Sequence, residues 1–128
     1  MNRHTSRENA YLMIFEYGYG KYDSLEEMQA LALEERGLML DDFGRALLEG
    51  VVNNITEIDS VISSNSSNWS SSRISKAALA ALRLAVYEIK YTDLSAAVAI
   101  NEAVELTKKY DMPEAASFVN GILGSVAK

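Results

Sequence analysis

The chain has 128 residues, no cysteine and a formal net charge of −6. This length suits one domain with a sizeable hydrophobic core, and the lack of cysteine excludes disulfides and thiolate chemistry. No apolar run is long enough to span a membrane and the start does not resemble a signal peptide. We therefore expect a soluble cytoplasmic protein without a membrane partner.

The charge is unevenly distributed along the chain. Residues 23–60 hold ten acidic residues against Arg36 and Arg45, a net charge of −8, whereas the segments before and after them each carry +1. A protein that coats nucleic-acid duplexes would be basic. Any binding of nucleic acid must therefore use a local patch near one end of the chain.

Helical spacing of apolar residues dominates the first third of the chain. It predicts a first helix over about residues 3–17, which ends at Gly18. Ser24 followed by Glu27 three residues later forms a capping-box pattern and predicts the start of a second helix. That helix is expected to stop near Gly37.

A long third helix is expected to begin at Asp41 or Asp42. Its apolar stripe consists of Phe43, Leu47, Val51, Ile55, Ile58 and Ile62. Residues 60–75 then hold nine serines, a composition that fits a flexible linker or a capped loop. We favour the loop, because Trp69 and Ile74 interrupt the serines with groups that prefer burial.

Three further helices are expected after this loop. Ser75 caps the first, Asp93 or Ser95 the second, and Asp111 with Pro113 near position N1 starts the third. The inward-facing residues are expected to be Leu79, Leu82, Val86 and Ile89; Ile100, Ala103, Val104 and Thr107; and Phe118, Val119, Ile122 and Val126. No strand pattern or repeat is visible. Short connections between helices predict an all-α, compact helical bundle.

Residues that could support catalysis are scarce. His4 is the only histidine, and no nucleophile elbow or glycine-rich phosphate loop occurs. Glu102 and Glu105 share a helix face, but the helical di-iron pattern requires a histidine and further glutamates that are missing. We interpret the pair as a solvated or packing face, and expect no enzyme, no metal and no cofactor.

The start of the first helix and the end of the helix before Pro113 carry the residues that fit nucleic-acid binding. Arg3 and Arg7 are four residues apart and share a helix face, with His4 beside Arg3. At a helix N-terminus these residues fit either an ordinary solvated end or an anion-binding patch. Tyr110 follows a lysine pair at a helix end, where an exposed ring can stack on a base.

Two sequence words carry a family resemblance. Residues 98–106, VAINEAVEL, and residues 118–123, FVNGIL, resemble the C-terminal half of the NusB family of bacterial transcription antitermination factors. Residues 82–89, LRLAVYEI, match the family helix before them, and residues 47–51, LLEGV, lie where the family has a similar turn of helix. The resemblance is strong from about Ala77 onward and mostly positional before Asp41.

The resemblance implies a fold and a function. The fold would be a single NusB-like domain over residues 1–128, a bundle of about seven helices in two three-helix subdomains, about 1–69 and 70–128. The function would be that of a non-enzymatic RNA-binding adaptor for transcription antitermination on ribosomal RNA operons. Its partners would be boxA-type single-stranded RNA, the ribosomal small-subunit protein NusE, and the RNA polymerase elongation complex with other Nus factors.

The resemblance also implies site residues. The RNA-binding positions would be Arg3, His4, Arg7, Phe15, Lys109, Tyr110, Glu114 and Phe118. Family members often have an aspartate at the position of Glu114, where a carboxylate would repel phosphate and limit affinity. The family's basic N-terminal run is usually denser than the one here.

A second face, for NusE, would include Arg73, Lys76 and Ala78. Some members have a carboxylate where this chain has Ala78. Two alternatives remain open from the sequence: a helical protein-interaction or self-associating module, such as a homodimer, with weak or no RNA binding, and a module like the one fused to certain ribosomal RNA cytosine methyltransferases.

Overall fold

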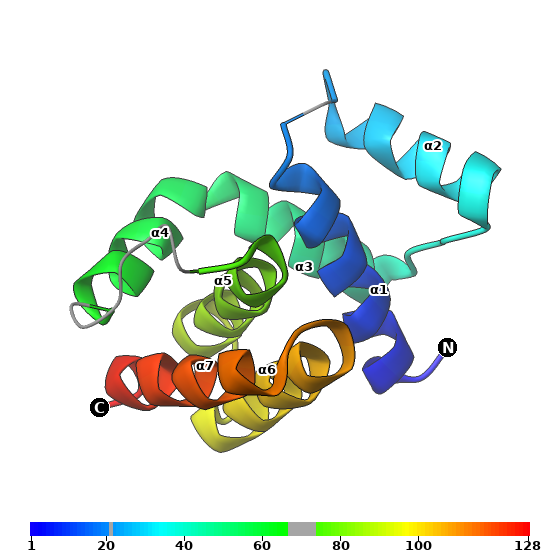
Figure 1. Cartoon of the computed structure of the whole chain (residues 1–128). Helices are drawn as coiled ribbons and strands as arrows, with labels where there is room; N and C mark the ends of the chain where they lie inside the picture. Colours follow the sequence, from blue (N-terminus) through cyan, green and yellow to red (C-terminus); the bar gives the residue numbers. More distant parts are fainter. Residues whose placement is uncertain (21, 67–73) are drawn as a thin grey trace.

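The structure, a computed structural model, describes residues 1–20, 22–66 and 74–128, and within them the chain is helical without any strand (Figure 1). The expected all-α fold is confirmed. The helices are α1 (Arg3–Tyr17), α2 (Leu25–Arg36), α3 (Asp42–Asn53), α4 (Ile55–Ser64), α5 (Lys76–Tyr91), α6 (Ala96–Tyr110) and α7 (Pro113–Val126).

Local capping accounts for most helix starts. The Ser24 hydroxyl accepts a hydrogen bond from the Glu27 N–H, and the Asp41 carboxylate accepts one from Gly44. Ser75 and Ser95 cap α5 and α6 in the same way. Each cap satisfies one of the N–H groups that a helix leaves unpaired at its start. The predicted starts at these four residues are therefore confirmed.

The predicted long third helix is wrong, because the structure has two helices there. α3 ends at Asn53 and α4 begins at Ile55, with Asn54 between them at φ −116° and ψ 20°. The Asn54 side-chain amide donates to the Gly50 carbonyl at 2.8 Å. Asparagine side chains compete in this way for backbone groups, so the helix breaks although the apolar spacing continues across it.

α5 lies at the centre of the molecule and contacts α1, α3, α4, α6 and α7 (Figure 1). Its small or branched residues Ala81, Leu82 and Val86 are fully buried. α3 approaches α5 so closely at Gly50 that a Cβ atom there would overlap the Tyr87 ring. This contact requires glycine because no larger residue leaves room for the ring.

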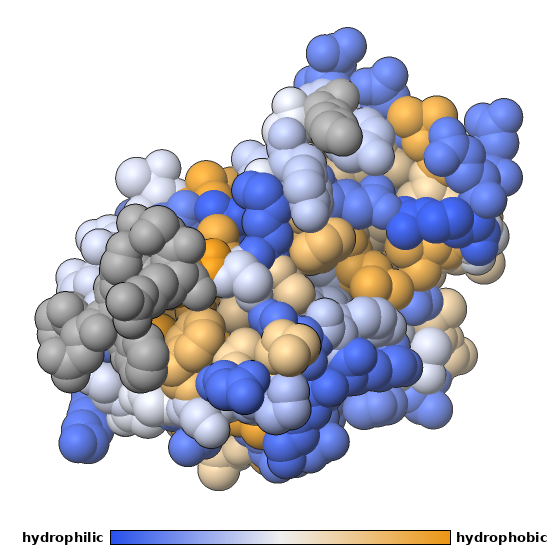
Figure 2. Space-filling view, viewed as in Figure 1, coloured by the Kyte–Doolittle hydropathy of each residue, from blue (hydrophilic) through white to orange (hydrophobic). Residues whose placement is uncertain are grey.

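α2 makes its main contact with α1 and projects from one side of the bundle (Figure 1). It buries Met28 and Ala32 and ends at Gly37, whose φ of 65° is left-handed and suits glycine. Figure 2 shows hydrophilic residues on the outer side of α2 and hydrophobic ones between α2 and the bundle.

The two predicted subdomains stay a prediction. Their boundary near residue 70, together with Trp69, lies outside the described residues. On either side of it, α1 packs on α3 while α5, α6 and α7 pack on one another, and α5 contacts both groups. Most of the expected inward-facing residues are buried; those only half-buried are Phe43, Ile55, Leu79, Ile89, Ile100, Val104 and Phe118. No helix in the described part of the chain has the length and apolar character needed to cross a bilayer.

Candidate nucleic-acid interface

One face of α1 carries His4, Glu8, Tyr11 and Phe15, each three or four residues after the last, and we call it the α1 stripe. It lies beside the C-terminal end of α6 and the N-terminal end of α5. The Tyr11 hydroxyl donates to the Ala77 carbonyl at 2.9 Å, which ties the stripe to α5. The packing thus brings together parts of the chain that are about 70 to 100 residues apart.

Glu8 binds the end of α6 to the α1 stripe. Lys109 Nζ donates to Glu8 Oε2 at 2.6 Å, and the Tyr110 hydroxyl donates to the same oxygen. Partial burial opposes ionisation of Glu8, but the hydrogen bonds from Lys109 and Tyr110 outweigh it and lower the pKa of the carboxyl. The same hydrogen bond to Glu8 raises the pKa of Lys109, so both groups stay charged at neutral pH.

Tyr110 presents a partly exposed ring at this junction. The residue is 39% exposed, and its ring lies 5.4 Å from that of Tyr11, with the planes tilted by 33°. Lys109 Nζ lies 5.5 Å from the Tyr110 ring centroid, within cation–π range. An aromatic surface beside a cation fits the stacking of an unpaired base next to its phosphate.

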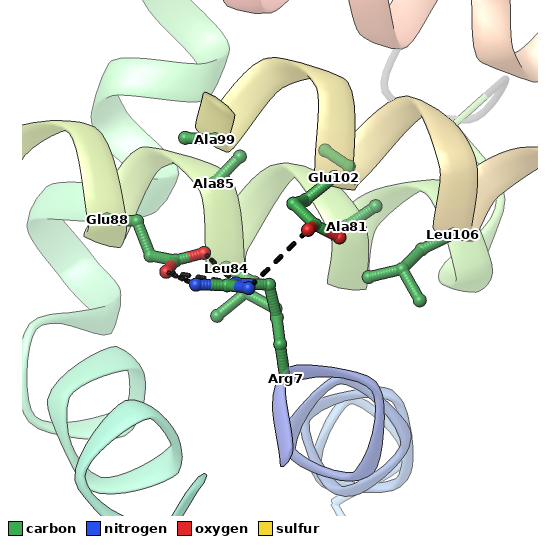
Figure 3. A pocket seen from close by; sticks show the side chains of 9 residues that line it. Arg7, Ala81, Leu84, Ala85, Glu88, Ala99, Glu102 and Leu106 are labelled. Atoms are coloured by element: carbon green, nitrogen blue, oxygen red, sulfur yellow. Dashed lines mark hydrogen bonds and ion pairs between the residues drawn. The ribbon is translucent and has the colours of Figure 1, made fainter. Parts of the chain in front are cut away.

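Arg7 does not reach the same surface. It is 6% exposed, and its side chain points from α1 toward Glu88 on α5 and Glu102 on α6 (Figure 3). Its guanidinium pairs with Glu88 at 3.0 Å and with Glu102 at 3.6 Å. Arg3 and Arg7 share a helix face as expected, with Cζ atoms 4.0 and 5.4 Å from the Phe43 ring centroid. The expectation that Arg7 is available to RNA is corrected, because the bundle supplies two carboxylates that compensate a buried guanidinium.

Arg3 and His4 remain exposed at the N-terminal end of α1. Arg3 lies over the Phe43 ring, with Cζ 4.0 Å from the centroid. His4 Nδ1 lies 3.3 Å from Glu102, which is the half-buried member of the glutamate pair on α6. Glu105 is exposed, and the described residues contain no cluster of acidic or histidine side chains that could hold a metal ion.

The other expected RNA-binding residues lie at different places around these helices. Glu114 is exposed in the first turn of α7, where its charge favours the helix dipole. Phe118 is half-buried one turn further along α7. Phe15 packs edge-on against Tyr19, with ring centroids 5.3 Å apart, at the opposite end of the α1 stripe from His4.

Of the three expected partner-binding residues, one is exposed, one is buried and one lies outside the described residues. Lys76 is exposed at the start of α5, where Nζ donates to the Gly18 carbonyl at 3.4 Å and lies 5.0 Å from the Tyr19 ring centroid. Ala78 is 0% exposed, so the expectation that it lies on an exposed face is corrected. It lies on the same face of α5 as Ala81, Leu82 and Ala85, which are also buried against the other helices. Arg73 lies outside the described residues.

Sequence reasoning missed Glu8, Tyr11 and Tyr19. The signal for Glu8 and Tyr11 was their spacing from His4, which places all three on one helix face. Their partners Lys109 and Tyr110 follow them by about 100 residues, and no local pattern links such distant positions.

These features define the class of the protein as an all-helical interaction module with a polar and aromatic patch where α1 meets α5 and α6. The chain belongs to the NusB family, whose family model matches residues 4–128. The transcription antitermination protein NusB of Acetivibrio thermocellus is 47% identical over 131 residues, which span 100% of this chain and 90% of that protein. NusB of Ruminiclostridium cellulolyticum is 38% identical over 133 residues, which span 100% of this chain and 90% of that protein.

Solved structures agree with this assignment. T. maritima NusB superposes with a TM-score of 0.84 at 30% identity, covering 99% of this chain and 91% of that one. A crystal structure of the antitermination factors NusB and NusE in complex with dsRNA matches with a TM-score of 0.82 at 27% identity. That match covers 98% of this chain and 95% of the other.

Proposed function

We propose that this protein is a non-enzymatic RNA-binding adaptor in transcription antitermination, which binds boxA-type single-stranded RNA together with NusE. The observation that carries the proposal is the patch at the N-terminal half of α1, where His4, Lys109 and the Tyr110 ring lie together. It occurs in a chain similar throughout its length to a protein crystallised with NusE and RNA. A role on the transcribing polymerase implies action in the cytoplasm.

Charge supports a local rather than a general mode of RNA binding. The protein is acidic overall, with a net charge of −6. Arg3, Lys108 and Lys109 are exposed, and of these Lys109 is paired with Glu8. A few phosphate contacts together with one stacked base suit a short single strand better than a long duplex.

We assign NusE to the other end of the α1 stripe. Phe15, Tyr19 and Lys76 lie together there, at the junction of α1 and α5. Aromatic residues such as Phe15 and Tyr19 are enriched at protein interfaces. Because both proposed surfaces share α1, ordering of this helix by one ligand would favour binding of the other, and any such coupling must be reciprocal.

The proposal is tested by titrating labelled boxA-type RNA with the protein, alone and with purified NusE, at two salt concentrations. We expect tighter RNA binding with NusE present and, in the reverse titration, tighter NusE binding by the same factor when RNA is present. An RNA of equal length and scrambled sequence is the control. Absence of RNA binding under all four conditions would refute the RNA-binding role.

Variants of Arg3 and Arg7 sharpen this test. Arg3→Ala should weaken RNA binding and flatten its salt dependence by roughly 0.7 log units per log unit of salt for each phosphate that the arginine binds. The effect of Arg7 substitution should appear in stability instead, since its guanidinium is held by Glu88 and Glu102. An equal salt slope for Arg3→Ala and the unmodified protein would remove Arg3 from the RNA site.

A second candidate function is self-association with little RNA binding, and α2 carries the observation that favours it. Leu33 and Met39 are 51% and 56% exposed and border an apolar groove between α2 and the bundle (Figure 2). Size-exclusion chromatography with light scattering distinguishes the two. A dimer that loses affinity on Leu33→Glu substitution would support self-association, whereas a monomer that binds RNA would support the adaptor.

A further inference from the structure

Glu8 is an acidic side chain inside the patch that we propose for RNA, and the proposed function does not explain its presence there. Its side chain is only 16% exposed and lies between α1 and the C-terminal end of α6. A buried or half-buried carboxylate next to a phosphate path raises the electrostatic cost of binding a polyanion. Its contacts indicate what it does instead.

A single oxygen of Glu8 binds both groups that would contact RNA. Oε2 accepts a hydrogen bond from Lys109 Nζ at 2.6 Å and another from the Tyr110 hydroxyl. The Lys109 side chain is 59% exposed, and Glu8 is its one carboxylate partner in the described part of the chain. In the protein without RNA, the Glu8 carboxylate therefore already occupies the position beside Lys109 that a phosphate would take.

This arrangement changes what RNA can gain from Lys109. The ion pair has no net charge, so the ammonium attracts a distant phosphate far less than an unpaired lysine would. A phosphate that reaches Lys109 must displace Glu8 or lie close to its negative charge. Displacing Glu8 would break its hydrogen bonds with Lys109 and Tyr110 and leave a mostly covered carboxylate uncompensated, so the exchange yields little net binding energy.

We propose that Glu8 is an affinity-setting residue, an intramolecular competitor that occupies Lys109 and the Tyr110 hydroxyl in place of RNA phosphate. This inference rests on the proposed function and deepens it. Contact with the RNA backbone at this point is suppressed, and the partly exposed Tyr110 ring stays available for stacking on a base. Lys109 acts on RNA only when Glu8 is absent or neutral.

The test is a double-mutant cycle with Glu8→Gln and Lys109→Gln. Glutamine keeps an oxygen that accepts the Tyr110 hydrogen bond, so the ring retains its anchor while the charge is removed. Glu34→Gln, at an exposed position on α2, is the matched control for a change of overall charge. Binding of boxA-type RNA is measured by fluorescence anisotropy at several salt concentrations, and circular dichroism checks that each variant is folded.

We expect Glu8→Gln to bind RNA about fivefold more tightly, the size of one charge interaction at contact in water. Its salt slope should steepen by roughly 0.7 log units per log unit of salt, because one more cation is available to phosphate. Lys109→Gln alone should weaken binding by a similar factor, because it leaves the carboxylate of Glu8 unpaired beside the RNA. Added to Glu8→Gln, it should abolish the gain. Glu34→Gln should bind as the unmodified protein does.

Three results would overturn the proposal: unchanged binding by Glu8→Gln, weaker binding by it, or a gain that persists when Lys109→Gln is added to Glu8→Gln. The second would make Glu8 a positioning residue, and the third would show that the gain does not come from Lys109.

Failure of the RNA-binding function is recognised separately, by absence of RNA binding in every variant. In that case, competition between Glu8 and phosphate for Lys109 is tested by titration with inorganic tripolyphosphate. NMR shifts of the Lys109 and Tyr110 amides should respond more strongly in Glu8→Gln than in the unmodified protein, and an equal response would reject the competition.

Discussion

The Arg7 guanidinium on α1 donates hydrogen bonds from Nε and Nη2 to both carboxylate oxygens of Glu88 on α5, at 3.0 and 3.1 Å (Figure 3). Both side chains are almost completely buried. Burial raises the pKa of Glu88, and hydrogen bonds from Arg7 oppose that rise. Loss of Arg7 leaves Glu88 buried without an ion-pair partner, whereas loss of Glu88 leaves Arg7 with Glu102 alone, at 3.6 Å.

Arg7→Ala should therefore destabilise the protein by roughly 3–5 kcal/mol, the usual cost of removing one member of a buried ion pair. Urea denaturation followed by circular dichroism measures the change. Arg45→Ala, which removes an exposed pair with Asp42, is the control and should cost less than about 1 kcal/mol. The double substitution Arg7→Met with Glu88→Leu should recover much of the loss. Equal stabilities for the two arginine variants would contradict the structural role of Arg7.

Asp41 should give the protein a defined loss of stability in acid. A hydrogen bond from Ser6, at 2.6 Å, and another from the Gly44 N–H lower the pKa of Asp41 below its ordinary value of 3.8. The unfolded chain binds more protons than the folded one near this pH, so stability rises with pH there. The contribution of Asp41 is thus present above pH 3.8 and is lost as the pH falls through the lowered pKa.

Ser6→Ala removes the largest cause of that shift, so the pKa of Asp41 should rise and the free energy of unfolding should depend less on pH in acid. NMR titration of the Asp41 carboxyl and denaturation at a series of pH values measure the two effects. Comparison with the unmodified protein cancels the contribution of Glu88, whose pKa is shifted upward. Ser117→Ala, on the exposed side of α7, serves as the control; an Asp41 titration that Ser6→Ala leaves unmoved would disprove the mechanism.

Gly50→Ala should be destabilising by about 1–3 kcal/mol, because the new methyl group would overlap the Tyr87 ring and force α3 away from α5. Gly121→Ala is the matched control, since no atom lies within 4 Å of a Cβ added there. That change removes glycine from the interior of α7 and should stabilise the protein by about 0.5–1 kcal/mol. Thermal unfolding of both variants measures the opposite signs. A neutral Gly50→Ala would show that α3 and α5 adjust freely.

Glu114→Gln should tighten RNA binding, up to about fivefold, if the first turn of α7 faces the bound strand. This gain corresponds to one charge interaction of about 1 kcal/mol at contact in water. The same change should cost roughly 0.3–1 kcal/mol of stability, because a carboxylate near a helix N-terminus favours the dipole. Anisotropy and denaturation measure the two effects. Unchanged or weaker RNA affinity would remove Glu114 from the RNA site.

Local sequence rules predicted the helices well. Capping residues such as Ser24, Asp41 and Ser95 act within three residues of their own positions, so their roles are readable in order along the chain. The same locality explains the one error among the helices. The apolar spacing continues from α3 into α4, and only the hydrogen bond from Asn54 to Gly50 reveals the break.

The sequence alone also determined the family, because the segments VAINEAVEL in α6 and FVNGIL in α7 resemble those of NusB proteins. Tertiary structure decided which charged residues remain on the surface. Arg3 and Arg7 are both arginines on α1, yet only Arg7 forms ion pairs with carboxylates from α5 and α6. Burial of Ala78 and the capture of Lys109 by Glu8 were likewise decided by how the helices pack. Such contacts join residues some 80 to 100 positions apart, where helical periodicity carries no information about partners.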